Sequence, residues 1–281
     1  MSSDSANPLG ITRCGNIEFR WGQRTYVMGI VNVDPDSFSG DGLRDVDAAV
    51  AQGHKFVAEG ADIIDVGGES TRPDSRPISV EEELRRVMPV IERLAGTLPV
   101  PVSIDTYKVE VAREAVASGA RMINDIWGLK RDPRLAGVAA KAGIPLIIMQ
   151  NQRDTLFHDF FPELITSFKR SVQLALDAGV DWSNIIIDPG VGFGKTVEQN
   201  IEIVRRLEGL KVLGRPILLG TSRKSFIGHV LDLPVDQRLE GTAATVAIGI
   251  ANGADMVRVH DVAQMVRVVR MSDAIVRGKP S

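Results

Sequence analysis

Eight short apolar runs recur along the chain, and each is followed by a longer segment with helical spacing. The runs are mostly four to six residues long, rich in Val and Ile, and continuously apolar. Continuous apolar runs are typical of strands that are buried on both faces of a parallel sheet. The predicted strands are 26–31, 62–66, 100–104, 121–123, 145–149, 184–187, 216–219 and 255–259.

The intervening segments predict eight helices, at 46–59, 80–94, 109–118, 134–142, 162–178, 197–207, 238–251 and 262–276. Glycine follows several of them (Gly60, Gly119, Gly143, Gly179 and Gly253), as expected for a left-handed helix cap. Eight strand–helix units in 281 residues predict one α/β domain, a (β/α)8 TIM barrel over residues 15–281. We expect residues 1–14 to form a flexible tail and entry segment. The structural alternative is a doubly wound open sheet, but no GxGxxG motif follows the first run.

Charge and cysteine content exclude some classes of protein. The net charge of −3, from 33 basic and 36 acidic residues, argues against broad nucleic-acid binding. The single cysteine, Cys14, forms no intramolecular disulfide and no Cys-based metal site. The sequence contains no apolar run of membrane-spanning length, and residues 1–9 lack the order of a signal peptide. We therefore expect a cytoplasmic protein without a membrane partner.

Polar residues follow the predicted strands at the end where TIM barrels carry their active sites. A purely structural explanation is that such residues cap helices and turns, which fits Ser79 and Asp132. It does not explain Asp65, Asp105 and Asp188, which lie directly on apolar strands, where desolvating a carboxylate is costly without a partner. The sequence therefore predicts a site at this end of the barrel.

Seven segments resemble, in order, the motifs of the dihydropteroate synthase family, and the resemblance extends from about Gly15 to the last helix. They are NVDPDSF at 32–38, IDVGGESTRP at 64–73, SIDT at 103–106, IND at 123–125, DPGVGFGK at 188–195, SRKS at 222–225 and RVHD at 258–261. The resemblance implies a transferase of folate biosynthesis that condenses 6-hydroxymethyl-7,8-dihydropterin diphosphate with p-aminobenzoate, giving 7,8-dihydropteroate and diphosphate. It also implies Mg²⁺ as cofactor and a homodimer.

The resemblance assigns the site residues by role. It implies a pterin pocket of Asp105, Asn124, Met149, Asp188 and Lys224. It implies a diphosphate site of Asn32, Thr71, Ser222, Arg258 and His260, with Asn32 as the metal ligand. It implies a p-aminobenzoate site of Phe38, Thr71, Pro73, Phe193, Lys224 and Ser225. The expected catalytic residues are Asp105, Lys224, Arg258 and His260, although Lys224 has the alternative of a surface lysine and His260 that of a packed core histidine.

The chemistry expected of these residues is carbon–nitrogen bond formation with loss of diphosphate. The arylamine is a weak nucleophile and the leaving group is a good one, so we expect a dissociative path in which Asp105 stabilises a pterin methyl cation. The nearest alternative is a pterin-binding methyltransferase acting on methyltetrahydrofolate and a corrinoid protein. Two further alternatives are a non-catalytic pterin-binding module and a lyase that uses Lys224 as a Schiff base.

Overall fold

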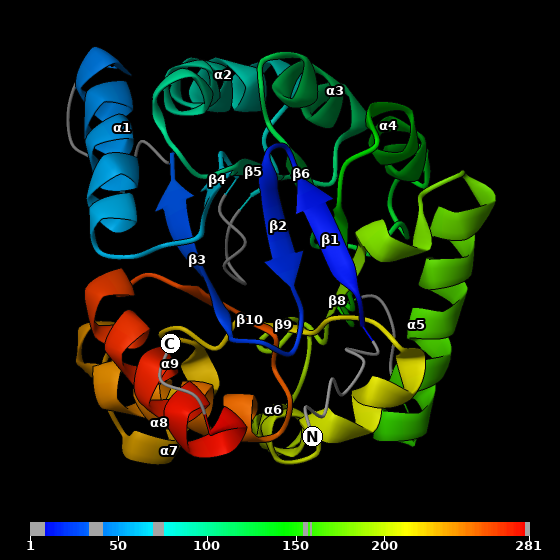
Figure 1. The fold of residues 1–281 in the computed structure, drawn as a ribbon, viewed down its shortest axis with the longest axis vertical. Helices are drawn as coiled ribbons and strands as arrows, with labels where there is room; N and C mark the ends of the chain where they lie inside the picture. Colours follow the sequence, from blue (N-terminus) through cyan, green and yellow to red (C-terminus); the bar gives the residue numbers. More distant parts are fainter. Residues whose placement is uncertain (1–8, 34–41, 70–75, 154–156, 158, 279–281) are drawn as a thin grey trace, which may run out of the picture.

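The computed structural model describes residues 9–33, 42–69, 76–153, 157 and 159–278. Its main element is an eight-stranded parallel sheet that closes on itself, with helices around it (Figure 1). The strands neighbour one another in the order β8-β7-β6-β5-β4-β3-β10-β9, and a parallel bridge between Ile187 and Ile217 joins the two ends. The predicted (β/α)8 barrel is therefore confirmed. Its strands are β3 (Tyr26–Asn32), β4 (Ile63–Gly67), β5 (Val102–Asp105), β6 (Met122–Asp125), β7 (Leu146–Met149), β8 (Ile185–Asp188), β9 (Leu218–Leu219) and β10 (Met256–Val259).

The helices surround the barrel and cover the outward faces of the strands (Figure 1). They are α1 (Gly42–Ala58), α2 (Val80–Thr97), α3 (Val109–Ala117), α4 (Arg134–Ala142), α5 (Phe160–Asp177), α6 (Val197–Arg205), α7 (Ser225–Leu231), α8 (Leu239–Ala251) and α9 (Val262–Arg277), with 3-10 turns η1 (Trp182–Asn184), η2 (Leu207–Leu213) and η3 (Val235–Gln237). Helix α7 is not among the eight helices predicted from periodicity, because seven residues are too few for a periodic signal. Among the described residues, no helix combines the length and the apolarity that crossing a membrane requires.

Local signals in the sequence set several helix ends. The Ser79 hydroxyl accepts a hydrogen bond from the Glu82 N–H at 3.2 Å and so caps α2, as predicted. Helix α6 begins with a complete capping box between Thr196 and Gln199. All five glycines that were predicted to follow helices have positive φ, which an L side chain adopts only with strain.

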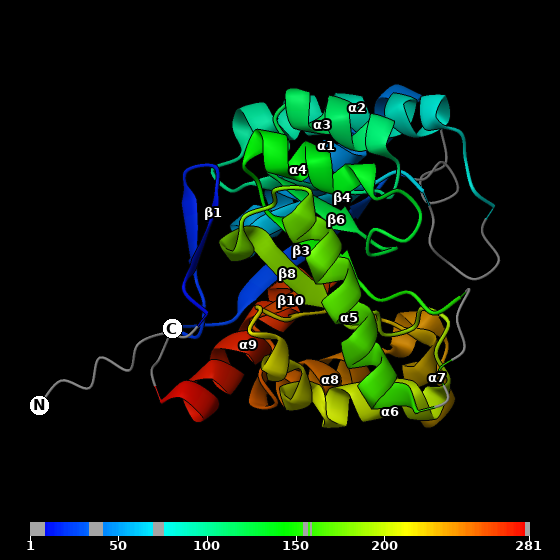
Figure 2. The same ribbon diagram turned by 90° about the vertical axis from the view of Figure 1, so that its right-hand side faces the viewer.

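A β-hairpin of β1 (Ile11–Cys14) and β2 (Ile17–Arg20) covers the end of the barrel where the strands begin (Figure 2). Phe19 and Trp21, which are fully buried, pack with Tyr26 and Met28 of β3. This hairpin is not among the predicted elements. The boundary expected at residue 15 falls in its turn, between β1 and β2, so Ile11–Cys14 packs with the barrel. The Gly15-Asn16 pair between two short runs was the available signal, since such pairs form two-residue hairpin turns.

Two successive layers of side chains point into the barrel. The first layer is apolar and consists of Met28, Ile63, Met122, Ile147, Ile186, Leu218 and Met256. Side chains alternate between the two faces of a strand, so the residues two positions later point inward as well. These are Ile30, Asp65, Asn124, Met149, Asp188, Gly220 and Arg258, joined by Asp105 through its register with Asn124. The second layer is therefore mostly polar, and it lies at the carboxyl end of the strands.

Candidate active site

A network of charged side chains occupies the carboxyl end of the barrel. Arg258 of β10 donates from Nε to Asp65 Oδ2 and from Nη2 to Asp105 Oδ2, both at 2.6 Å. The amide of Asn124 donates to the same Asp65 oxygen at 2.9 Å. Asp65, which is fully buried, thus holds residues of β6 and β10 together. Asn124 keeps its side-chain oxygen as an acceptor, and Arg258 keeps three further N–H donors.

Asp188, Phe193 and Lys224 form the next part of the site. Asp188 is buried, and one oxygen of its carboxylate accepts the Gly190 N–H at 2.7 Å. Lys224 lies between the loops that follow β8 and β9, with its Nζ 4.2 Å from the centre of the Phe193 ring. Lys224 is therefore half-buried against the site rather than a free surface lysine.

Burial shifts the pKa values of these groups in the direction that favours their uncharged forms. It raises the pKa of Asp105 to about 7, against the opposing charge of Arg258, and that of Asp188 to about 6. It lowers the pKa of Lys224 to about 8, and the neighbouring Arg258 charge acts in the same direction. In each case the main cause is the free-energy cost of placing a charge in a region with little water. Shifted titrations in a cleft are typical of functional sites.

His260 follows β10 and is oriented by Ser222. The Ser222 hydroxyl oxygen accepts the His260 backbone N–H at 3.1 Å and lies 2.9 Å from Nδ1 of the imidazole. Burial and the nearby Arg258 charge lower the pKa of His260 to about 3, so the ring is neutral at physiological pH. When the Ser222 hydroxyl donates to Nδ1, the neutral ring carries its proton on Nε2, which is then a donor.

An apolar cluster adjoins the polar network. Ile126, Trp127, Met149 and Phe193 are buried together, and Tyr107 packs on them. The rings of Tyr107 and Trp127 meet edge to face, with centroids 6.4 Å apart. A cluster of this kind next to a polar edge matches a flat heteroaromatic ligand, whose face is apolar and whose rim carries donors and acceptors.

Some polar residues that the sequence brings to this end have structural partners. Asp125 accepts the Trp127 N–H at 2.8 Å and the Leu129 N–H at 2.6 Å, and so shapes the loop after β6. Arg223 pairs with Asp261, which joins the loops after β9 and β10. These contacts explain why polar residues occur at nearly every strand end without all of them facing a ligand.

Two residues that the sequence analysis left without a role organise the loop after β8. The Lys195 ammonium donates to backbone carbonyls, and the Asn200 amide oxygen accepts the Gly192 N–H at 2.7 Å. The available signal was a lysine inside a glycine-rich segment, which suggests a cation enclosed by backbone.

The remaining predicted residues divide into two groups. Asn32 and Ser225 are exposed, at the end of β3 and at the start of α7, so both are open to a ligand. Phe38, Thr71 and Pro73 lie outside the described residues. Within the described part of the chain, no group of three or more His, Cys, Asp or Glu side chains is arranged to hold a metal ion. The donor available at the mouth is the Asn32 side-chain oxygen, which suits a metal that is held mainly by a ligand's phosphates.

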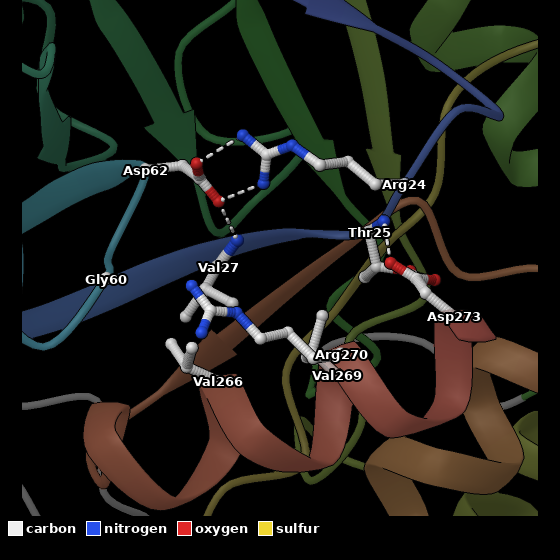
Figure 3. A pocket seen from close by; sticks show the side chains of 9 residues that line it. All are labelled: Arg24, Thr25, Val27, Gly60, Asp62, Val266, Val269, Arg270 and Asp273. Carbon is white, nitrogen blue, oxygen red and sulfur yellow. Dashed lines mark hydrogen bonds and ion pairs between the residues drawn. The ribbon is translucent and has the colours of Figure 1, made fainter. Parts of the chain in front are cut away.

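A separate cavity of about 220 Å³ lies between the start of β3 and helix α9 (Figure 3). Three of its charged side chains are held by neighbours: Asp62 binds Arg24 at 2.6 and 2.9 Å, and Asp273 accepts the Thr25 N–H at 2.7 Å. This cavity is at the opposite end of the strands from the polar layer. These contacts join the start of β3 to its neighbours and so have a structural role.

Comparison with known proteins agrees with this arrangement. Residues 28–260 match the family model described as "Pterin binding enzyme". The chain is 52% identical over 267 residues to the dihydropteroate synthase of Clostridium beijerinckii, covering 94% of this chain and 99% of that protein. The solved dihydropteroate synthase of Clostridium difficile, determined with pteroic acid, is 52% identical with a TM-score of 0.89, and the match covers 92% of this chain and 98% of that one. The Xanthomonas albilineans enzyme, solved with 7,8-dihydropteroate, is 40% identical with a TM-score of 0.86, and the match covers 94% and 98%.

The fold and the site at the carboxyl end of the barrel agree with a pterin-binding enzyme, and the sequence similarity to dihydropteroate synthases favours this interpretation over the methyltransferase alternative. The chain belongs to the pterin-binding enzyme family and is, within it, a dihydropteroate synthase of folate biosynthesis.

Proposed function

We propose that the polar layer at the carboxyl end of the barrel binds the pterin and that the residues around it position the diphosphate and the arylamine. The observation that carries this proposal is the convergence of Asp105, Asn124, Asp188 and Lys224 beside the apolar cluster of Met149 and Phe193. The relatives solved with pteroic acid and with 7,8-dihydropteroate support a ligand of this class.

These residues have hydrogen-bond donors and acceptors left free, and these match the edge of the pterin. Asp188 has lone pairs left for two N–H donors of the aminopyrimidine, and Asn124 has its amide oxygen. Lys224 donates to the ring acceptors, and Met149 packs on the ring face. A ligand with the wrong edge would leave these buried groups unpaired, and this mismatch gives the pocket its specificity.

The diphosphate would be bound by Asn32, Thr71, Ser222, Arg258 and His260. Arg258 contributes the N–H groups that Asp65 and Asp105 leave free, and His260 contributes its Nε2–H. Asn32, together with phosphate oxygens of the substrate, would hold Mg²⁺, which would supply charge neutralisation at the leaving group. Phe38, Thr71, Pro73, Phe193, Lys224 and Ser225 would form the p-aminobenzoate site.

We infer a dissociative reaction, in which the carbon–oxygen bond to diphosphate breaks before the arylamine attacks. Arg258 and His260 stabilise the departing diphosphate, and the Asp105 carboxylate stabilises the positive charge that develops on the pterin methylene. The aniline nitrogen then forms the new carbon–nitrogen bond and releases a proton to solvent. Catalytic roles in this scheme fall to Asp105, Arg258 and His260, and to Lys224 as the donor to the ring acceptors of the pterin.

We also propose that the protein is a cytoplasmic homodimer that associates through α7, η3 and α8. Val230, Val235 and Ile248 are more than half exposed there, and Leu231 packs against Gly241 of α8. Exposed apolar side chains on neighbouring elements are typical of an interaction surface. Sedimentation of the parent protein and of Ile248→Glu tests this surface. A dimer that becomes a monomer is expected, and a monomeric parent protein would refute the proposal.

One assay tests the function. The protein is incubated with the pterin methyl diphosphate, p-aminobenzoate and Mg²⁺, and the products are separated. Dihydropteroate and diphosphate in equal amounts are expected, and both should disappear when Mg²⁺ is chelated. Diphosphate release without formation of dihydropteroate, when all three components are present, would contradict the proposed reaction.

A further inference from the structure

The Lys195 ammonium joins three backbone carbonyls that come from two different segments. Its Nζ donates to Gln150 O at 2.6 Å, to Gly190 O at 3.0 Å and to Phe193 O at 3.3 Å. Gln150 directly follows β7, whereas Gly190 and Phe193 belong to the loop after β8. One side chain therefore fastens this loop to the end of the neighbouring strand.

The partners of Lys195 suit a cation. An ammonium group has three N–H donors, and the three carbonyls match that number. Burial lowers the pKa of Lys195 to about 7, while the Asp188 charge favours the protonated form. Keeping a charge in such a place is costly, and a loop that needed only good packing would be served as well by an apolar side chain.

The shape of the loop depends on the same contacts. Gly190 and Gly194 have φ of +69° and +68°, and a Cβ on them would lie 2.3 Å from Gln150 O and 2.5 Å from Arg153 N. The loop thus lies in direct backbone contact with the segment after β7. Since its glycines offer no side-chain packing of their own, the ammonium and the Asn200 amide supply the fixed points.

This loop positions two residues of the proposed pterin pocket, Asp188 and Phe193. The Gly190 N–H holds the Asp188 carboxylate at 2.7 Å, and the Phe193 ring lies beneath Lys224 Nζ at 4.2 Å. We propose that Lys195 is a positioning residue for the reaction, which holds Asp188 and Phe193 in the geometry that binds the pterin. This inference rests on the proposed function of the same pocket.

Lys195→Met tests the proposal, because it keeps an unbranched side chain and removes the donors. We expect the dissociation constant for the pterin methyl diphosphate, measured by calorimetry, to rise roughly tenfold to a hundredfold, since a small displacement of binding groups has effects of that order. Lys130→Met is the matched control. Its Nζ also donates to a carbonyl near the end of β7, Asn151 O at 2.9 Å, and we expect a change within about twofold.

A rescue experiment separates positioning from a purely structural role. Lys195→Cys is alkylated in the folded state with bromoethylamine, which restores an ammonium at nearly the length of lysine, or with iodoethane, which adds a neutral ethyl group without N–H donors. Cys14 should not react, because burial raises the pKa of its thiol to about 12, and mass spectrometry confirms a single label. Pterin affinity should return with the ammonium and not with the ethyl group.

The outcomes separate the two proposals. A parent protein that does not bind the pterin would overturn the proposed function and this inference with it. A parent protein that binds the pterin, together with unchanged affinity in Lys195→Met or equal affinity of the two alkylated forms, would overturn the role of Lys195 alone. In that case a lower melting temperature of Lys195→Met would assign the residue to folding only.

Discussion

At the scale of single residues, each polar group in the site is oriented by a neighbour. Asp65 orients Asn124 and Arg258, Gly190 orients Asp188, and Ser222 orients His260. The ligand-facing atoms are those that these contacts leave unused. Substitutions that keep the shape and remove one hydrogen-bonding function therefore test individual roles.

Asp188→Asn replaces an acceptor-only carboxylate by an amide of the same shape. We expect pterin binding to weaken by roughly 2–3 kcal/mol, because a charge-assisted contact is lost and an amide N–H then faces the N–H groups of the ligand. Isothermal titration calorimetry measures the change. Asp255→Asn is the control, since Asp255 is also a buried carboxylate whose pKa is raised to about 6 by burial, but it accepts the Ile217 N–H at the other end of the strands. Equal losses of affinity in the two variants would contradict a specific role for Asp188.

Asp105→Asn removes the charge that we assign to stabilising the pterin cation. Because that charge acts mainly in the transition state, turnover should fall further than pterin affinity does. A loss of about 3 kcal/mol of barrier stabilisation would slow the reaction roughly a hundredfold. Steady-state kinetics with calorimetry on the same samples gives both quantities. Undiminished turnover would exclude this role for Asp105.

His260 links the site to the pH dependence of stability. Its pKa is about 3 in the folded protein and about 6.5 when exposed, so the unfolded chain takes up a proton as pH falls through 6.5 and the folded protein does not. The contribution of neutral His260 to the free energy of unfolding is thus fully present above pH 6.5 and decreases below it. Near pH 5 the decrease is about 2 kcal/mol. His260→Asn should gain stability relative to the parent protein between about pH 7.5 and 5. Denaturant unfolding at both pH values measures this, and a constant difference would refute the shifted pKa.

At the scale of elements, the loop between β8 and α6 connects backbone geometry to the site. Gly190→Ala adds a Cβ that would lie 2.3 Å from Gln150 O, in addition to the strain of a positive φ. Gly143→Ala is the matched control, because φ there is +65° and the space around it is open. We expect Gly143→Ala to cost about 1 kcal/mol in the free energy of unfolding and Gly190→Ala to cost more.

The two glycine variants should also differ in function. Gly190→Ala should weaken pterin binding, since the Gly190 N–H holds Asp188, whereas Gly143→Ala should bind the pterin as the parent protein does. Unfolding curves and calorimetry on both proteins provide the comparison. A Gly190→Ala protein of full affinity would show that the loop tolerates displacement.

At the scale of the whole molecule, the barrel separates stability at one end from ligand binding at the other. Phe19 and Trp21 of the hairpin are buried against the first apolar layer, while the polar layer lies two residues further along each strand. Phe19→Ala should lower the free energy of unfolding by about 3–5 kcal/mol through a cavity beneath the barrel. Pterin affinity of the folded protein should stay within about twofold of the parent value. A large loss of affinity would show that the two ends are coupled.

The sequence by itself determined the barrel and much of its site. Eight apolar runs that alternate with helical segments leave few other ways to bury the runs, and Asp65, Asp105, Asn124 and Asp188 then lie at the strand ends where barrels carry their sites. These features are local in the chain, since each depends on residues within one strand or helix. For the same reason, helix caps such as Ser79 and the left-handed glycines could be predicted.

Only the tertiary structure decided how the inward side chains are paired. Arg258 lies 193 positions from Asp65 and 153 from Asp105, and Lys195 lies 45 from Gln150, so no local pattern records these contacts. The burial that shifts the pKa values of Asp105, Asp188 and Lys224 is likewise a property of the closed barrel. A single chain's periodicity specifies which face of an element is buried, but the partner of a buried charge depends on elements that meet only when the barrel closes.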